Sequence, residues 1–330
     1  MSQGTATPAT PQVSAGGAAS PQNPREAPPR ISVCIATYRR PERLAALLAD
    51  LVHQELLPEE VIVVDNDGEG SARAVVEACR DGAPPFLVLY DIQPQKNISL
   101  TRNRTVALAS GDWLAFVDDD ERAPAHWLRR LADTELRCGA DGVLGPVEPI
   151  VPPQAPAWIQ RGRFYDWSHM FSGVPVPPNK LRFGNVLLRA GLLAGDPAPF
   201  DPAYGLTGGE DGDLLARLTQ RGARIVWCDE AEVFEPIEQS RLSLRWLLRR
   251  SLRGGQDFAR HALHGRYGAV SGAVRARLFA RALLQALLAA LLALVSLPAG
   301  RHHAAHWLTR LSANLGKLSV FWGAHYREYA

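Results

Sequence analysis

Cysteine is scarce in this sequence, and its spacing excludes several kinds of protein. The four cysteines lie far apart, with no Cys-x-x-Cys pair. This spacing argues against zinc fingers and a disulfide framework, so we expect reduced, mostly buried thiols, as in a reducing cytoplasm. Residues 1–30 lack the apolar segment of a signal peptide and are rich in Ala, Pro, Ser, Gln and Thr. We expect these residues to form a disordered tail.

A large net charge is also missing. The 36 basic and 34 acidic side chains leave a net charge of +2, which argues against a protein that binds nucleic acid. The charges are unevenly distributed, because twelve arginines and a single acidic residue, Asp257, lie between Arg241 and Arg310. The sequence therefore predicts that most carboxylates belong to the part of the chain before this basic region.

Short apolar runs alternate with amphipathic segments from Ile31 onward. The runs at 31–36, 61–65, 86–90 and 113–117 predict buried strands, and helices are expected at 41–53, 72–80 and 100–109. Further strands are expected at 182–188 and 223–227, with a helix at 214–221 between them. This alternation predicts an α/β, Rossmann-like domain over residues 31–240, with a mainly parallel sheet and helices on both faces.

Polar residues lie at the carboxyl ends of the predicted strands. Thr37 follows the first strand, Asp65 ends the second, and Asp118-Asp119-Asp120 follow the fourth. Ligands of parallel α/β sheets bind outside these ends, so we expect one crevice to collect all of these residues. Adjacent carboxylates repel one another, and Mg²⁺ or Mn²⁺ prefers their oxygens together with substrate phosphates. The cluster predicts a metal site that holds a diphosphate, with a solvated, helix-capping loop as the alternative. Asp65 is expected to bind a nucleobase or ribose, to close an Asx turn, or both.

Glu210 and Asp211 form a second acidic group, after two glycines in the run Gly-Gly-Glu-Asp-Gly. Glycine lets a backbone approach a ligand closely, and a carboxylate suits removal of a proton from an acceptor hydroxyl. Capping of the helix that follows is the alternative role. Arg241, Arg245 and Trp246 are candidates for binding a diphosphate or acceptor phosphate, or form the basic face of a surface helix.

The most apolar stretch runs over 16 residues, from Ala282 to Leu297, between Arg281 and Pro298. A membrane-spanning helix needs about 20 such residues. A short or tilted span, an interfacial helix and a core helix are all compatible with it. Because the flanking arginines would be attracted to an anionic membrane surface, we expect residues 241–330 to be helical, basic and membrane-associated.

Five motifs, in this order, resemble glycosyltransferase family 2, and within it bacterial enzymes of exopolysaccharide (succinoglycan-type) assembly. The motifs are Ile31–Pro41, Val61–Asp65, Thr101–Arg104, Trp113–Asp120 and Gly208–Asp211. The resemblance extends over about residues 30–260. It implies a GT-A fold followed by a C-terminal helical region. Its activity would be inverting transfer of a sugar from a nucleotide-sugar, in first place a UDP-sugar, to a lipid-linked or polysaccharide acceptor in cell-surface glycan synthesis.

The resemblance also implies roles for individual residues. Asp211 would be the catalytic base with Glu210 beside it, and Asp118–Asp120 would be the DxD metal motif for Mg²⁺ or Mn²⁺. Residues implied in nucleotide-sugar binding are Thr37, Tyr38, Arg39, Asp65, Arg102, Asn103, Asp118 and Asp119. Processive members carry Gln-x-x-Arg-Trp, but Leu242 stands in place of the glutamine, so we expect transfer of one sugar. The implied location is the cytoplasmic face of the bacterial inner membrane.

Two other functions account for less of the sequence. A sugar-phosphate nucleotidyltransferase would need a glycine-rich, basic phosphate loop after the first strand, where residues 36–40 are Ala-Thr-Tyr-Arg-Arg. A non-catalytic glycan- or lipid-binding membrane protein would have no need of intact Asp118–Asp120 and Asp211.

Overall fold

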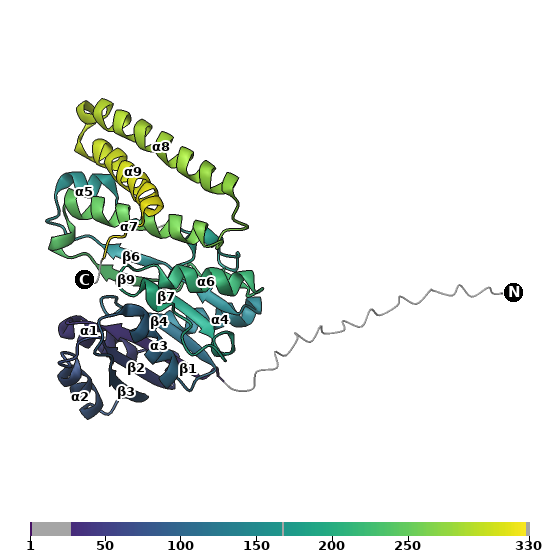
Figure 1. Cartoon of the computed structure of the whole chain (residues 1–330). Coiled ribbons are helices and arrows are strands. Elements are labelled where there is room, and N and C mark those ends of the chain that lie inside the picture. The colour runs from purple at the N-terminus through teal and green to yellow at the C-terminus, as the bar shows by residue number, and fades with distance from the viewer. Residues whose placement is uncertain (2–27, 167, 328–330) are drawn as a thin grey trace.

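The computed structural model describes residues 1, 28–166 and 168–327 (Figure 1). The tail expected at residues 1–30 therefore falls almost entirely outside the described residues. All four cysteines are free thiols; Cys34 and Cys228 are buried, whereas Cys79 and Cys138 are half-buried.

The first part of the described chain alternates strands and helices, as the sequence predicted. Its elements are β1 (Ile31–Thr37), α1 (Pro41–Val52), β2 (Glu60–Asp65), α2 (Arg73–Asp81), β3 (Leu87–Ile92), α3 (Ile98–Leu108), β4 (Trp113–Val117) and α4 (Trp127–Cys138). Pro41 occupies the first turn of α1, where its missing N–H costs no hydrogen bond. The predicted boundaries agree with these to within two residues.

The second part is less regular. It contains β5 (Gly142–Leu144), β6 (Val147–Ile150), α5 (Ala157–Gly162), β7 (Asn185–Arg189), α6 (Glu210–Gln220), β8 (Ile225–Trp227) and β9 (Val233–Pro236). Two predicted boundaries were wrong. The strand expected from residue 182 begins at Asn185, and the helix expected from Leu214 begins at Glu210, so the Glu210–Asp211 pair lies in the first helical turn.

Seven of these strands form one sheet, in the order β3-β2-β1-β4-β7-β5-β8. β7 runs antiparallel to β4 and β5, whereas the other neighbouring pairs are parallel. Strands β6 and β9 pair separately, in parallel. The chain extends the sheet in one direction from β1 to β3 and then returns to place β4 on the other side of β1. The carboxyl ends of β1 and β4 therefore flank a topological switch point, where ligands of such sheets bind.

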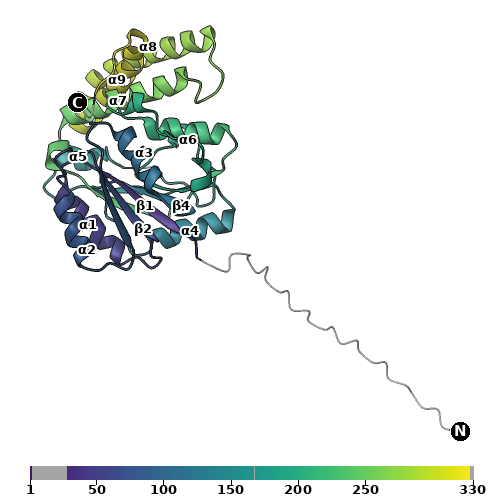
Figure 2. The same ribbon diagram turned by 60° about the horizontal axis from the view of Figure 1, so that its bottom comes forward.

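Helices cover both faces of the sheet, as Figure 2 shows with α1, α2 and α4 on one side and α3 and α6 on the other. Side chains of β1 explain why both faces can be covered. Val33 and Ile35 belong to the core under α1 and α4, whereas Cys34 belongs to the core under α6. Side chains on both faces of the strand are thus removed from water, which is why the run is mostly apolar. The predicted fold class, a mainly parallel α/β sheet followed by helices, is confirmed.

Three long helices follow, α7 (Leu244–Leu263), α8 (Gly272–Val295) and α9 (Arg301–Ser319). α9 lies between α7 and α8, and α8 is the outermost element of the stack (Figure 1). Two glycines allow the close approach of α7 and α9. A Cβ atom on Gly255 would overlap the carbonyl oxygen of Ala313, and one on Gly316 would overlap that of Leu252. The helical region expected from residue 241 is thus packed onto the α/β part of the chain through α7.

Candidate active site

Thr37 and the aspartate cluster meet at the switch point of the sheet. The Thr37 hydroxyl, at the end of β1, donates a hydrogen bond of 2.8 Å to Oδ2 of Asp119, which follows β4. Asp65 is paired with Thr37 in the β1–β2 ladder. The structure therefore brings Thr37, Asp65 and the aspartates to the same edge of the sheet, as the sequence suggested.

Asp65 is fully buried and shapes the loop that follows it. Its carboxylate accepts hydrogen bonds from the backbone N–H groups of Asp67 (2.9 Å) and Ala72 (2.8 Å) and from the Tyr90 hydroxyl (3.2 Å). The bond from Asp67 closes the Asx turn that was one of its expected roles. A direct contact of Asp65 with a nucleoside stays a prediction.

Half-buried Tyr38 and exposed Arg39 form a rim beside this loop. Arg39 adopts a left-handed backbone, with φ of 53°, and its guanidinium pairs with Asp67 at 2.9 Å. The Tyr38 ring lies under two cations, with Arg39 at 5.3 Å and Lys96 at 4.8 Å from its centroid. The two cations make the surroundings of this ring positive, which favours an anionic ligand.

Asp119 and Asp120 are buried and already have cationic partners. The Arg40 guanidinium lies 3.0 Å from a carboxylate oxygen of Asp119 and 2.9 Å from one of Asp120. Arg241 lies 3.0 Å from the same oxygen of Asp120. Burial raises the pKa of Asp119 to about 6, and Arg40 opposes this shift. Arginines therefore offset the repulsion within the aspartate cluster, and charge balance does not require a metal ion.

Asp118 differs from its two neighbours because 47% of its side chain is exposed. One of its oxygens accepts a hydrogen bond of 3.0 Å from Arg102. The same guanidinium donates to Glu210 at 2.5 Å, so Arg102 connects the end of β4 with the start of α6. Within the described residues, Oε2 of the buried Glu210 has no hydrogen-bond partner. Burial raises the pKa of Glu210 to about 7, and Arg102 opposes this shift.

Asn103 lies beside Arg102 but has a different environment. Its amide group exchanges two hydrogen bonds of 2.8 Å with the backbone of Phe200. Asn103 therefore fixes the segment that leads to the Gly208–Asp211 motif, and a contact with substrate stays a prediction.

The loop before α6 is held by a residue that sequence reasoning missed. Gly209 has a left-handed φ of 94°, and its carbonyl oxygen lies 2.9 Å from Nε2 of His261 on α7. Burial lowers the pKa of His261, so the ring is neutral and its Nε2–H donates to this carbonyl. A Cβ atom on Gly212 would lie 2.8 Å from the same ring. Because His261 is distant from this loop in the sequence, no local pattern reveals the contact.

Asp211, the predicted base, is oriented by the chain segment before β7. Its Oδ2 accepts a hydrogen bond of 2.9 Å from the backbone N–H of Phe183. The alternative role of the pair, favourable placement of negative charge at a helix N-terminus, also applies, since both carboxylates lie in the first turn of α6. Glu210 and Asp211 differ in surroundings: Glu210 is buried against Arg102, whereas Asp211 is half-exposed.

Of the three residues proposed for phosphate or acceptor binding, Arg241 contacts the aspartate cluster and Trp246 lies next to Arg241. Arg241 pairs with Asp120 and with Glu235. The Trp246 ring stacks on Tyr165, with a centroid distance of 5.8 Å. Arg245 is exposed on α7. Arg241 thus links the aspartate cluster to the aromatic side chains around Tyr165.

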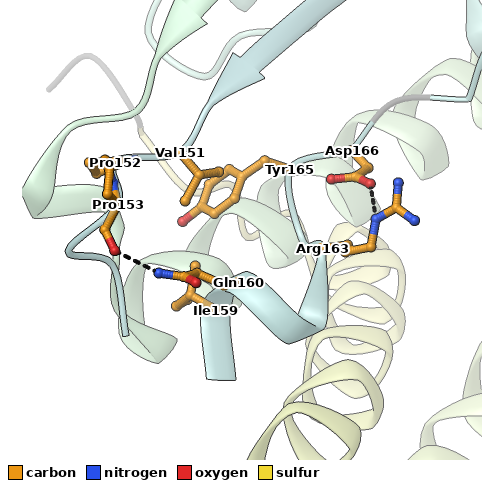
Figure 3. Close-up of a pocket in the computed structure, with 8 residues that line it drawn as sticks. All are labelled: Val151, Pro152, Pro153, Ile159, Gln160, Arg163, Tyr165 and Asp166. Carbon is orange, nitrogen blue, oxygen red and sulfur yellow. Dashed lines mark hydrogen bonds and ion pairs between the residues drawn. The ribbon is translucent and has the colours of Figure 1, made fainter. Parts of the chain in front are cut away.

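A cavity of about 540 Å³ lies next to these aromatic side chains. It is lined by Val151, Pro152, Pro153, Ile159, Gln160, Arg163, Tyr165 and Asp166, which Figure 3 draws as sticks. The Tyr165 hydroxyl donates a hydrogen bond of 2.7 Å to the backbone oxygen of Arg241. The cavity therefore lies beside the site and shares this tyrosine wall with it.

The arrangement fits a divalent cation that is bound mainly through substrate. No group of three or more His, Cys, Asp or Glu side chains in the part of the chain that the structure describes is arranged to hold a metal ion. Mg²⁺ in phosphate-transfer sites commonly takes only one or two carboxylates and completes its shell with substrate phosphates and water. Asp118, with its half-exposed carboxylate, is the residue best placed to be such a ligand.

Comparisons of sequence agree with the predicted family. The family profile described as Glycosyl transferase family 2 matches residues 32–184. The succinoglycan biosynthesis protein ExoM of Rhizobium meliloti (strain 1021) is 41% identical over 238 residues, which cover 70% of this chain and 74% of ExoM. Galactofuranosyltransferase GlfT1 of Mycobacterium tuberculosis is 28% identical over 221 residues, which cover 61% of this chain and 68% of GlfT1.

Solved structures agree with the fold. The mannosyltransferase PcManGT from Pyrobaculum calidifontis, solved with GDP-Man and Mn²⁺, matches with a TM-score of 0.58 and 17% identity over 91% of this chain and 89% of its own. S. aureus TarS 1-349, solved with UDP, matches with a TM-score of 0.51 and 18% identity over 90% and 93%. At such identities the likeness concerns the fold alone, and it supports the GT-A class. Taken with the extent of the similarity to ExoM, these matches show that the chain belongs to glycosyltransferase family 2.

Proposed function

We propose that this glycosyltransferase moves one sugar from a nucleotide-sugar to a glycan or lipid-linked acceptor, with inversion at the anomeric carbon and with Mg²⁺ or Mn²⁺. The observation that carries the proposal is the Arg102 bridge. It joins exposed Asp118, on the proposed donor side, to Glu210, next to the proposed base Asp211. The groups proposed to bind a diphosphate and to activate a hydroxyl would thus act side by side.

The donor is proposed to be a nucleotide-sugar, in first place a UDP-sugar. Its nucleoside would lie along Thr37, Asp65 and the Tyr38–Arg39 rim. The likeness in fold to proteins solved with UDP and with GDP-Man supports this class of donor. Asp118 would hold the divalent ion, which when bound neutralises the charge that develops on the departing diphosphate. Arg102 would lie close enough to hydrogen-bond the same phosphates.

Asp211 is proposed to act on the acceptor. It would take the proton from the acceptor hydroxyl while that oxygen attacks the anomeric carbon from the side opposite the diphosphate. The hydrogen bond from the Phe183 N–H keeps the carboxylate in place. Burial raises the pKa of Glu210. This carboxyl group would hold Arg102 in place and would not exchange protons with substrate.

The acceptor is proposed to be a growing glycan on a lipid carrier at the cytoplasmic face of the inner membrane. The similarity to a succinoglycan biosynthesis protein supports a role in cell-surface glycan synthesis. The helix α8 is long and apolar enough to cross a membrane, which supports association with one. Leu242, in place of the glutamine of processive enzymes, supports transfer of a single sugar.

A panel of nucleotide-sugars tests the proposal. The purified protein is incubated with UDP- and GDP-sugars and Mn²⁺ or Mg²⁺, and both binding and slow donor hydrolysis are measured. We expect one donor to bind only with the metal ion and to be hydrolysed slowly. Asp211→Asn should bind this donor as tightly but lose transfer to acceptor. If no nucleotide-sugar binds with either ion, the proposed function is wrong.

A further inference from the structure

The outermost helix, α8, has two faces of different character. Its alanines 282, 286, 289 and 293 are at most 5% exposed. Three or four residues separate them, so they form one stripe, and the small side chains let α8 approach α9 closely. At about 100° per residue, Leu284, Leu287 and Leu291 point away from this stripe. These leucines are 68%, 63% and 57% exposed.

The exposed face is a continuous apolar surface. Besides these leucines it includes Leu283, Leu288, Leu294, Val295 and Leu297, each at least 43% exposed. Contiguous apolar surface of this kind marks a contact with a partner or with lipid. It is also separated from the candidate active site by α9 and α7 (Figure 1), so it is not part of that site.

The packing of α9 argues against α8 as a membrane-spanning helix. The 24 residues of α8 would extend about 36 Å, enough for a hydrocarbon core of about 30 Å. However, its alanine stripe is buried on α9, and α9 is fixed to α7 at Gly255 and Gly316. The Ser312 hydroxyl adds a hydrogen bond of 2.7 Å to the carbonyl oxygen of Leu248. To span the membrane, α8 would have to separate from α9, or the basic residues of α9 would have to enter the lipid.

The charges around α8 indicate which kind of partner covers the leucine face. No acidic residue occurs between Asp257 and Arg327. Arg275, Arg277 and Arg281 are exposed on α8, and Arg301 begins α9. A second copy of the chain would bring like charges together, whereas anionic lipid headgroups would complement them.

We propose that α8 lies in the plane of an anionic membrane, with its leucine face in the acyl layer and its alanine stripe on α9. This inference rests on the proposed membrane location and adds to it the mode of insertion. α8 is then an in-plane anchor that keeps both of its ends on one side of the membrane.

Vesicle flotation tests the leucine face. The full-length protein is mixed with vesicles of phosphatidylcholine, with or without phosphatidylglycerol. We expect it to float with the anionic vesicles, and Leu284→Glu with Leu291→Glu to abolish flotation. Leu136→Glu, at a leucine of α4 that is 40% exposed, is the matched control and should float like the wild type. The proposal is overturned if the α8 variant floats as well as the wild type. It is also overturned if the wild type binds no vesicles but forms a dimer in detergent-free buffer that the α8 variant does not form.

The arginines give a graded test of charge. Replacing Arg275, Arg277 and Arg281 by Gln should weaken binding to the anionic vesicles about fivefold per residue, and on the order of a hundredfold together. An unchanged affinity contradicts the electrostatic part of the proposal.

Cysteine labelling distinguishes an in-plane from a spanning helix. Val270→Cys and Ala299→Cys place a thiol just outside each end of α8 and outside its leucine face, in a background with Cys79→Ser and Cys138→Ser. An impermeant maleimide should label both thiols in inside-out membrane vesicles and neither in intact cells. Labelling of either thiol in intact cells shows a span and overturns the proposal. Donor hydrolysis, measured without vesicles, reports on the proposed transferase independently: its absence with normal flotation rejects the enzyme function and leaves the anchor.

Discussion

The three aspartates that follow β4 should separate into one metal ligand and two structural residues. The substitutions are Asp118→Asn, Asp119→Asn and Asp120→Asn, each of which removes one charge and keeps the size of the side chain. Asp118 is half-exposed, whereas Asp119 and Asp120 are 4% and 8% exposed and are paired with arginine. We therefore expect Asp118→Asn to weaken ligand binding with little loss of stability, and Asp119→Asn and Asp120→Asn to lower stability but keep ligand binding.

The expected magnitudes follow from these environments. Asp118→Asn breaks a pair with one half-exposed partner, so it should lower the free energy of unfolding by only about 0.2–1 kcal/mol. Asp119→Asn and Asp120→Asn weaken buried, charge-assisted hydrogen bonds and should cost about 1.5–3 kcal/mol each. Nucleotide and Mn²⁺ at 100 times the dissociation constant stabilise the wild type by about 2.7 kcal/mol. A hundredfold loss of affinity in Asp118→Asn would reduce that gain to about 0.4 kcal/mol.

Chemical unfolding, with and without UDP and Mn²⁺, measures both quantities on the same samples. The wild type, Asp119→Asn and Asp120→Asn should be stabilised by the ligand, and the last two should start from a lower stability. Asp118→Asn should start near the wild type and gain little. If Asp118→Asn keeps the full gain while Asp120→Asn loses it, Asp118 is not the metal ligand.

Three other predictions concern the supports of the site. Burial raises the pKa of Glu210 to about 7, above its usual 4.5, so its contribution to stability should fall as the pH rises from about 4.5 through 7. The free energy of unfolding in urea should show this fall for the wild type and not for Glu210→Gln. The same pH dependence in both proteins would contradict the prediction. His261→Phe leaves the Gly209 carbonyl without its hydrogen-bond partner and should lower the free energy of unfolding by about 1–3 kcal/mol. It should change kcat more than the KM for the nucleotide-sugar. Unchanged kinetics would show that His261 does not position the loop. Gly255→Ala should destabilise the chain by about 1–3 kcal/mol because it separates α7 from α9. Its neighbour Gly254, which has open space around it, should gain up to about 1 kcal/mol on replacement by Ala; equal effects of the two changes would refute the close helix crossing.

Local patterns were sufficient to predict most of the sheet. Apolar runs such as Val61–Asp65 bury both faces of a strand, so their period and their turn residues indicate the element directly. The helix α6 was predicted to begin too late because Glu210 and Asp211 are polar, although acidic residues are favourable in a first turn. The short strands β5, β6 and β9, of three or four residues, carry too few side chains to show a period.

The candidate site was predicted in part, for a similar reason. The meeting of Thr37 with Asp119 follows from strand order and from the rule that ligands bind at strand ends. The partners of the acidic residues did not follow, because Arg40, Arg241 and His261 come from distant segments. A sequence shows that three carboxylates are adjacent, but only the tertiary structure shows which of them are neutralised within the protein.

The stacking of α8, α9 and α7 has a geometric consequence for the substrate. Packed helices lie about 8–10 Å apart, so two layers place the loop that His261 holds roughly 20 Å below the axis of α8. If α8 rests in the lipid, an acceptor anchored in the same leaflet must reach across that height to present its hydroxyl to Asp211. The height of the helical stack would then set a minimum length for the acceptor. Lipid carriers whose saccharide is already several units long would reach Asp211, and those bearing a single sugar would not.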